Sequence, residues 1–375
     1  MYVRAHALFE GFMAGLAAQP QASLVHSLSE PPVLADFLAE LDPLLPLDWS
    51  GQSFFGLPAL REQVLGRTRL AAACSTDDVL ITAGAAEANF LAISQLVQPG
   101  DEMIVDVPGW PQPLVLGEAI GAVVKHLQRH ETQGWKFDLD QLAELVNERT
   151  RLIFLCNPNN PTGQVVSDAE LRRVVDIAQR VGAYVLCDEV YAGLEWDGQA
   201  IPRVAGYYDR GISTGSVSKA LGLQGLRTGW MICRDPQLLF DAMVLREDTS
   251  EIMNIMGEAI AEIALREERY AAAMACARAA GRRNLATLDA WIDARAELSW
   301  VRPAAGLIGF CRLDTAITAD TLAAKLLAEP YRTFVMPGSA YGFSQHLRLG
   351  VGGGADSGME LALQRLGACL DALSR

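Results

Sequence analysis

Short apolar runs alternate with longer amphipathic segments along the first two thirds of the chain. The pattern predicts β-strands at residues 78–82, 102–106, 152–156, 184–188 and 212–216. Apolar residues at helical spacing predict helices at residues 85–96 and 167–180. Strands that alternate with helices predict an α/β fold of three layers, in which a mostly parallel sheet carries helices on both faces.

The pattern changes after about residue 280, where helical segments flank short apolar runs. It predicts helices at residues 271–291, 320–328 and 357–373, and strands at residues 306–313 and 347–351. Residues 1–19 have the spacing of an amphipathic helix. We therefore expect two domains: a large domain at residues 48–280, and a smaller α+β domain formed by residues 1–47 and 281–375.

Composition narrows the class of protein. A chain of 375 residues, half of them hydrophobic and a fifth charged, has enough apolar material for two globular domains. The net charge of −14 argues against a nucleic-acid partner. No apolar run is long enough to span a membrane, and the start lacks the pattern of a signal peptide. Seven scattered cysteines without a Cys-x-x-Cys pair predict reduced thiols, no metal site and a cytoplasmic location.

Residues capable of chemistry follow four of the predicted strands, namely Gly84, Asn160, Asp188 and Lys219. Open parallel sheets bind ligands beyond the carboxyl ends of their strands. We therefore expect these four residues to lie together in one site.

Lys219 is the most informative of the four. A lysine that forms a Schiff base with pyridoxal 5′-phosphate (PLP) needs space and anion-binding neighbours. Two hydroxyl residues, Ser216 and Ser218, precede it, and Arg227 follows after a glycine-rich turn, so that all three could bind the phosphate. Taken alone, the segment fits a solvated surface lysine equally well.

Two further residues suit the ring of the same cofactor. An ionised Asp188 would keep the pyridinium nitrogen protonated, although an aspartate that caps the next turn is the commoner case. Asn160 lies in a turn at residues 157–163 that contains two prolines and a glycine. Its amide would then be held still and could donate a hydrogen bond to the ring oxygen O3′.

The remaining candidates carry weaker signals. Gly84, Ala85 and Ala86 open a helix directly after a strand, so their backbone N–H groups would suit a phosphate. Trp110 would stack on the cofactor ring or simply pack in the core. Arg348 lies inside an apolar strand and needs an anion, either a substrate carboxylate or an internal carboxylate.

In their order along the chain, these motifs resemble the fold type I PLP-dependent enzymes, specifically the class I/II aminotransferases. The resemblance rests on residues 56–62, the helix start at residues 84–86, Trp110, Asn160, Asp188, Tyr191, Lys219, Arg227 and Arg348. It implies that Lys219 forms the Schiff base and carries protons, with Asp188 and Tyr191 as its catalytic partners. It further implies that Tyr191 bonds O3′ beside Asn160, and that two copies of the chain form a homodimer with active sites at the interface.

Two segments depart from the family pattern. The family has a tyrosine a few residues before the position of Gly56 that reaches the phosphate of the other subunit, whereas residues 49–55 contain none. We expect a serine or a water to take its place. Ala85 and Ala86 stand where hydroxyl residues are frequent, so this helix end would offer only backbone N–H groups.

The resemblance implies a PLP-dependent aminotransferase of amino-acid metabolism or biosynthesis that acts on an L-amino acid and a 2-oxo acid. Asn160 and Arg348 would bind the substrate. A PLP-dependent lyase or cyclase is the alternative, because residues 27–32 resemble those of capreomycidine-synthase-like enzymes. There Glu30 would face the guanidinium of an arginine-derived substrate, or it is simply a solvated glutamate.

Two other classes are disfavoured. A non-catalytic PLP-binding regulator would need a DNA-binding module, and we expect neither room for one nor a basic surface in this acidic chain. A nicotinamide enzyme would need a glycine fingerprint after its first strand, and the segment that opens at Gly84 has no such pattern.

Overall fold

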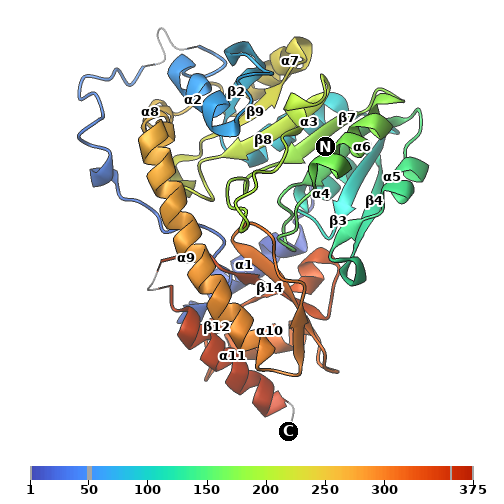
Figure 1. The fold of residues 1–375 in the computed structure, drawn as a ribbon, viewed down its shortest axis with the longest axis vertical. Coiled ribbons are helices and arrows are strands. Elements are labelled where there is room, and N and C mark those ends of the chain that lie inside the picture. Colours follow the sequence, from blue (N-terminus) through green and yellow to red (C-terminus); the bar gives the residue numbers. More distant parts are fainter. Residues whose placement is uncertain (1, 49–52, 355–356, 374–375) are drawn as a thin grey trace.

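A computed structural model describes residues 2–48, 53–354 and 357–373 (Figure 1). Within these ranges the largest sheet has eight strands in the order β2-β9-β8-β7-β6-β3-β4-β5. Their bounds are β2 Val79–Thr82, β3 Glu102–Val107, β4 Val123–His130, β5 Lys136–Phe137, β6 Thr150–Cys156, β7 Tyr184–Asp188, β8 Gly211–Ser216 and β9 Gly229–Cys233. Strands β4, β3, β6, β7 and β8 run parallel, while β9 is antiparallel to both β2 and β8 and β5 is antiparallel to β4.

Helices cover both faces of this sheet because its central strands are apolar on both sides. In β6, Leu152 and Phe154 pack into one buried cluster, and Ile153 and Leu155 pack into another. The first cluster lies under α3 (Ala85–Leu96), α4 (Gln112–Ile120) and α7 (Pro236–Glu247), and the second lies under α5 (Leu139–Leu145) and α6 (Asp168–Gln179). The predicted three-layer α/β fold is confirmed.

Local chemistry explains where the helix at residues 167–180 begins. Ser167 caps α6 by accepting a hydrogen bond from the backbone N–H of Glu170, and the Glu170 carboxylate accepts one from the backbone N–H of Ser167. This reciprocal pair satisfies two backbone donors that a helix start otherwise leaves unpaired.

A second, smaller sheet lies in the C-terminal third of the chain. It contains β10 (Leu298–Trp300), β11 (Ile308–Leu313), β14 (His346–Gly350) and β13 (Met336–Pro337), in that order and antiparallel. The helices α10 (Ala319–Leu327) and α11 (Met359–Leu373) accompany it. Short 3₁₀ turns complete the structure at η1 Leu34–Asp36, η2 Thr76–Asp78, η3 Glu131–Gln133, η4 Val204–Gly206, η5 Gln224–Leu226 and η6 Gly338–Tyr341.

The beginning of the chain joins this C-terminal part. Strand β1 (Ala22–Ser23) pairs in parallel with β12 (Thr333–Phe334), and α1 (Ala7–Ala17) lies against η6 and β13. Helix α2 (Pro58–Thr68) packs on α8 (Ile255–Leu265) instead. Figure 1 shows α9 (Glu267–Asp293) running from α8 to the region of α11, so the predicted domain boundary at residue 280 falls inside one continuous helix. The division into two domains at that residue stays a prediction.

Across the described ranges, none of the helices combines the length and the apolar character that crossing a lipid bilayer requires.

Candidate active site

A cavity of about 200 Å³ lies where the carboxyl ends of β6, β7 and β8 meet the N-terminus of α3. Ten predicted cofactor residues line it, namely Ala85, Ala86, Trp110, Asn160, Asp188, Tyr191, Ser216, Ser218, Lys219 and Arg227. Gly84, the eleventh, precedes α3 and lies against the guanidinium of Arg227. Cys156, Val190 and Gln224 complete the lining and were not predicted. The sheet therefore brings these residues together at the edge where the sequence places them.

Lys219 has no salt bridge or side-chain hydrogen bond with the described residues, and its Nζ lies 5.7 Å from the ring centroid of Tyr191. The chain has only four lysines. Lys125 and Lys136 form ion pairs with carboxylates, and Lys325 is exposed on α10. Lys219 is thus the one lysine in the cavity lining, with its amine unpaired.

Asp188 is buried at the end of β7 and faces this lysine. Its Oδ2 accepts a hydrogen bond from Asn89 Nδ2 at 2.8 Å, and its Oδ1 accepts one from the backbone N–H of Val190 at 3.3 Å. Burial raises the pKa of Asp188, while the hydrogen bond from Asn89 and the charge of Lys219 oppose that rise. A buried carboxylate of this kind needs a cationic partner.

Asn89 is a residue of this site that we did not predict. It lies on the buried side of α3, where it bonds Asp188 and also accepts a hydrogen bond from Thr214 Oγ1 at 2.8 Å. The β7–β8 register places Thr214 directly beside Asp188, which explains how one amide reaches both. The sequence did contain a signal for this role. Asn89 is an amide on the helix face whose other buried residues are apolar, and a buried amide needs a hydrogen-bond partner.

The opposite end of the cavity is suited to an anion. The backbone N–H groups of Ala85 and Ala86 at the start of α3 have no hydrogen-bond partner in the described chain. Arg227 Nη2 donates to the carbonyl of Ala83 at 3.0 Å, and Arg227 forms no ion pair with any described carboxylate. Gly84 has φ +88°, a conformation that favours glycine, and an added Cβ would lie 2.6 Å from Arg227 Nη2 and displace it. Helix N–H groups beside an arginine make a phosphate site.

Tyr191 and Asn160 supply unpaired polar groups between these two ends. Tyr191 is buried, and its hydroxyl has no hydrogen-bond partner among the described residues. Asn160 Oδ1 accepts a hydrogen bond from the hydroxyl of Tyr341 at 3.2 Å, which leaves Asn160 Nδ2 as a donor. Buried polar groups are rarely unsatisfied in folded proteins, so this pair indicates a ligand oxygen.

The residues present fit PLP. The unpaired Tyr191 hydroxyl matches an acceptor such as the ring oxygen, the buried Asp188 matches a cationic ring nitrogen, and the helix end with Arg227 matches a phosphate. Trp110 lies in the same lining, where its indole Nε1 donates to Gln112 Oε1 at 3.2 Å.

The two other predicted substrate residues lie outside the lining of this cavity. Arg348 lies on β14, is 3 % exposed, and has a buried Nε without a partner and no ion pair with a described carboxylate. It lies near Tyr341, whose pKa its charge lowers against the larger opposing effect of burial. Glu30 is exposed and lines a separate cavity of about 360 Å³. Ala220, the residue after Lys219, lines this second cavity too.

The segment that lacks the family's tyrosine lies partly outside the described residues, which resume at Ser53. Ser53 Oγ accepts a hydrogen bond from the backbone N–H of Phe55 at 3.1 Å. The group that replaces the tyrosine stays a prediction.

The fold and the cavity together define a PLP-binding protein of fold type I. The chain belongs to the family of class I and II aminotransferases, whose sequence pattern matches residues 50–366. The solved structure of a PLP-dependent aminotransferase from Streptococcus suis 89-1591 superimposes over 100 % of both chains, with a TM-score of 0.91 and 26 % identity.

Two curated relatives indicate how varied the family is. Capreomycidine synthase of Streptomyces vinaceus is 31 % identical over 275 residues, which are 72 % of this chain and 69 % of that protein. Nicotianamine aminotransferase 1 of Oryza sativa subsp. japonica is 32 % identical over 186 residues, 48 % of this chain. The aligned part spans only 38 % of the length of the rice protein.

Proposed function

We propose that the protein is a PLP-dependent aminotransferase that transfers an amino group from an L-amino acid to a 2-oxo acid, within amino-acid metabolism or biosynthesis. The observation that carries the proposal is the unpaired Lys219 in a cavity that has a buried carboxylate on one side and an anion-binding helix end on the other. When bound, PLP supplies an aldehyde that condenses with amines and a ring that accepts electrons from the substrate.

Each wall of the cavity would hold one part of the cofactor. Ser216, Ser218, Arg227 and the first N–H groups of α3 would bind the phosphate. Tyr191 and Asn160 would donate hydrogen bonds to the ring oxygen, and Trp110 would lie beside the ring. These contacts would hold the cofactor in the cavity that Lys219 lines.

Asp188 controls the charge of the ring. The hydrogen bond from Asn89 stabilises its ionised form in a buried position, where burial alone would favour the neutral acid. An ionised Asp188 stabilises a proton on the ring nitrogen, and that proton makes the ring a better electron acceptor. Asn89 therefore supports the reaction through Asp188 without touching the substrate.

Lys219 moves the substrate proton. Its Nζ has no partner that would hold it away from the cavity, so once displaced by substrate it can take the α-proton as a general base. The same amine would then hold that proton inside the cavity and be able to return it. Arg348 and Asn160 would orient the substrate by binding its α-carboxylate, which supplies the anion that the unpaired Arg348 guanidinium lacks.

A PLP-dependent cyclase or lyase is the second candidate, because a capreomycidine synthase aligns with 72 % of the chain. Glu30 supports this candidate. It lines a cavity that Ala220, the residue after Lys219, also lines, and the described lining residues include no arginine or lysine. We propose that a cationic side chain of an arginine-derived substrate would extend toward Glu30.

One assay separates the two candidates. The PLP-loaded protein is mixed with a panel of amino acids, arginine derivatives included, without any 2-oxo acid. We expect the cofactor absorbance to bleach, with one equivalent of 2-oxo acid released per active site. Turnover without an acceptor would establish the cyclase or lyase instead, and no reaction with any amino acid would refute both. The variant Glu30→Gln should lose preference for arginine derivatives under the second candidate and keep its substrate preference under the first.

We also propose that two copies of the chain form a homodimer through the segment after β1. Five apolar side chains there, Val33, Leu34, Leu38, Leu44 and Leu47, are each more than half exposed. We expect light scattering to give the mass of a dimer, and Leu44→Glu with Leu47→Glu to give a monomer. Leu361→Glu, at an exposed apolar position on α11, should leave the dimer intact. A monomeric wild-type protein at all concentrations would contradict the proposal.

A cytoplasmic location is likewise proposed. All seven cysteines are unpaired and six of them are buried, which is typical of proteins that keep their thiols reduced.

A further inference from the structure

The strand that ends at His130 and the turn that follows it lie between the two sheets of the molecule. We call residues 129–137 the β4–β5 hairpin, which contains η3 and Trp135. Its strands, β4 and β5, form one edge of the large sheet, while its tip contacts residues of the smaller sheet. The candidate site depends on both sheets, because Asn160 follows β6 and Arg348 lies on β14.

Trp135 is the main contact of the hairpin with the smaller sheet. It is 1 % exposed. The centroid of its ring lies 5.6 Å from that of Phe310, 5.4 Å from that of Phe343 and 5.5 Å from that of His346. Glu131 adds a polar contact, with its Oε2 3.3 Å from His346 Nε2. Edge-on aromatic contacts of this kind fix the relative position of the surfaces that they join.

These contacts lie next to Arg348 in the smaller sheet. Phe310 on β11 is the direct cross-strand partner of Arg348 on β14, and His346 is two residues before Arg348 on the same strand. Residues at this spacing share one face of a sheet. The face that carries Arg348 is therefore the face that packs against Trp135.

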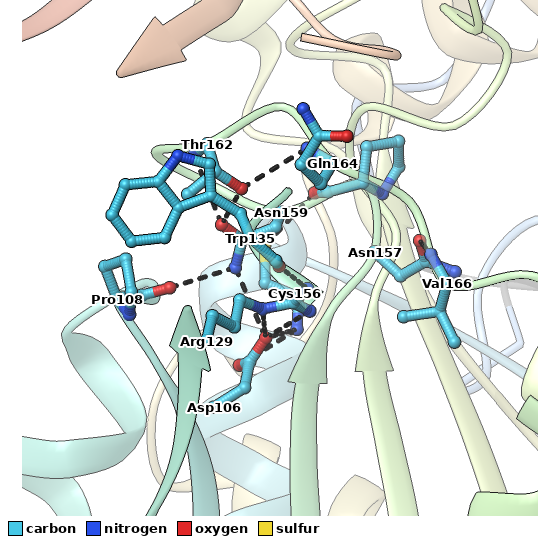
Figure 2. Close-up of polar contacts among 11 residues, drawn as sticks. Asp106, Pro108, Arg129, Trp135, Cys156, Asn157, Asn159, Thr162, Gln164 and Val166 are labelled. Atoms are coloured by element: carbon cyan, nitrogen blue, oxygen red, sulfur yellow. Dashed lines mark hydrogen bonds and ion pairs between the residues drawn. The ribbon is translucent and has the colours of Figure 1, made fainter. Parts of the chain in front are cut away.

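The other end of the hairpin is bonded to Asp106 on β3 (Figure 2). Arg129 donates to Asp106 Oδ2 through Nε at 2.9 Å and Nη2 at 2.7 Å, and its Nη1 donates to the carbonyl of Trp135 at 3.1 Å. Asp106 Oδ2 also accepts a hydrogen bond from Asn159 Nδ2 at 3.2 Å. One guanidinium thus links the backbone of Trp135 to the residue that precedes Asn160.

Asn159 in turn fixes the loop that carries Asn160. Its Nδ2 donates to the carbonyl of Pro108 at 3.1 Å, and its Oδ1 accepts the hydroxyl of Thr162 at 2.6 Å (Figure 2). All three residues of this chain of contacts, Asp106, Arg129 and Asn159, are buried. In a buried network, moving one member forces its hydrogen-bonding neighbours to move with it.

We infer that Trp135 and Arg129 are positioning residues that set the distance between Asn160, in the loop after β6, and Arg348, on β14. Neither residue lines the cavity. The inference rests on the proposed function, because it assumes that Asn160 and Arg348 bind one substrate carboxylate. Their separation then decides whether a carboxylate meets both donors at once, and a misplacement of about 1 Å is enough to weaken such a contact strongly.

The variants are chosen so that the fold survives. Removing Arg129 would leave the buried Asp106 carboxylate without its cation, so Arg129→Lys is used, which keeps a charge beside Asp106 but cannot also reach the carbonyl of Trp135. Trp135→Leu removes the aromatic contacts, and Trp135→Phe restores part of them. Trp300→Leu is the matched control, because Trp300 packs against Gly309 in the same small sheet, outside the hairpin contacts.

The experiment compares an amino-acid substrate with the amine that lacks its carboxylate. We expect Trp135→Leu and Arg129→Lys to raise KM for the amino acid about 10-fold at a nearly unchanged kcat, and to change the rate with the amine far less, because the amine presents no carboxylate. Trp135→Phe should recover most of the loss, and Trp300→Leu should show none. As a readout independent of turnover, calorimetry should show about 10-fold weaker binding of the unreactive carboxylic acid formed by removing the substrate's amino group.

An equal loss for the amino acid and the amine, or the same loss in Trp300→Leu, would overturn the inference, because it would show general destabilisation. If the wild-type protein reacts with amino acids and Trp135→Leu keeps its full preference for the carboxylate, only this inference falls. If the wild-type protein reacts with no amino acid, the proposed function falls and this inference falls with it.

Discussion

Replacing Lys219 by alanine is expected to lower turnover by about 10⁴-fold or more. The substitution removes the amine that condenses with the cofactor and also the base that moves the substrate proton. The other three lysines cannot substitute, since two are held in ion pairs and the third is exposed on α10. Steady-state kinetics with the best amino acid of the panel would measure the loss, and the absorbance of the lysine–cofactor adduct should disappear with it.

The matched control for this substitution is Lys325→Ala. Lys325 is exposed on α10, so its loss should leave both the activity and the absorbance unchanged. Normal turnover in Lys219→Ala would refute the central role given to this lysine. An absorbance that persists in Lys219→Ala would show that the cofactor is attached elsewhere.

Replacing Arg348 by glutamine should lower kcat/KM for an amino acid by about 100-fold, or ~3 kcal/mol. The guanidinium is buried and has no ion pair with a described carboxylate, so nothing else in the described chain would compensate a substrate carboxylate. Because the fork of an arginine binds both carboxylate oxygens, Arg348→Lys should recover only part of the loss.

A comparison with the corresponding amine tests whether the effect is due to the carboxylate. The wild-type enzyme should strongly prefer the amino acid, and Arg348→Gln should reduce that preference. Arg302→Gln is a suitable control, since Arg302 is largely exposed and pairs with Asp289. An Arg348→Gln variant that still prefers the amino acid to the same degree would show that another residue binds the carboxylate.

Much of the fold and most of the cavity lining could be predicted from the sequence. Apolar periodicity predicted α3 with the bounds that the structure shows and predicted every strand of the large sheet between β6 and β8. The candidate residues follow these strands, and the parallel arrangement brings strand ends to one edge. Asp188 and Lys219 are close for that reason, although 30 residues separate them in the sequence.

The partners of these residues could not be predicted in the same way. Asn89 reaches Asp188 across 99 positions of sequence, and Tyr341 reaches Asn160 across 181. Such contacts depend on strand register and on how the smaller sheet packs, and neither leaves a local pattern in the sequence. The orientation of a buried amide is likewise set by its neighbours in space.

Glu30 shows a further limit. Its segment is bonded to the loop of Lys219, because the backbone N–H of Ser29 donates to the carbonyl of Lys219 at 3.0 Å. The carboxylate itself is exposed in the neighbouring cavity. The sequence thus predicted the neighbourhood of this residue, and its contact with a substrate stays a prediction, because side-chain direction depends on the packed structure.

The pairing of β1 with β12 has a consequence for the order in which the protein can fold. Residues 22–23 leave the ribosome long before their strand partners at residues 333–334 are made. The large sheet can be completed from residues 79–233 while synthesis continues. The segment around β1 must wait, so its apolar residues stay exposed to chaperones and proteases until residues 333–334 have been translated.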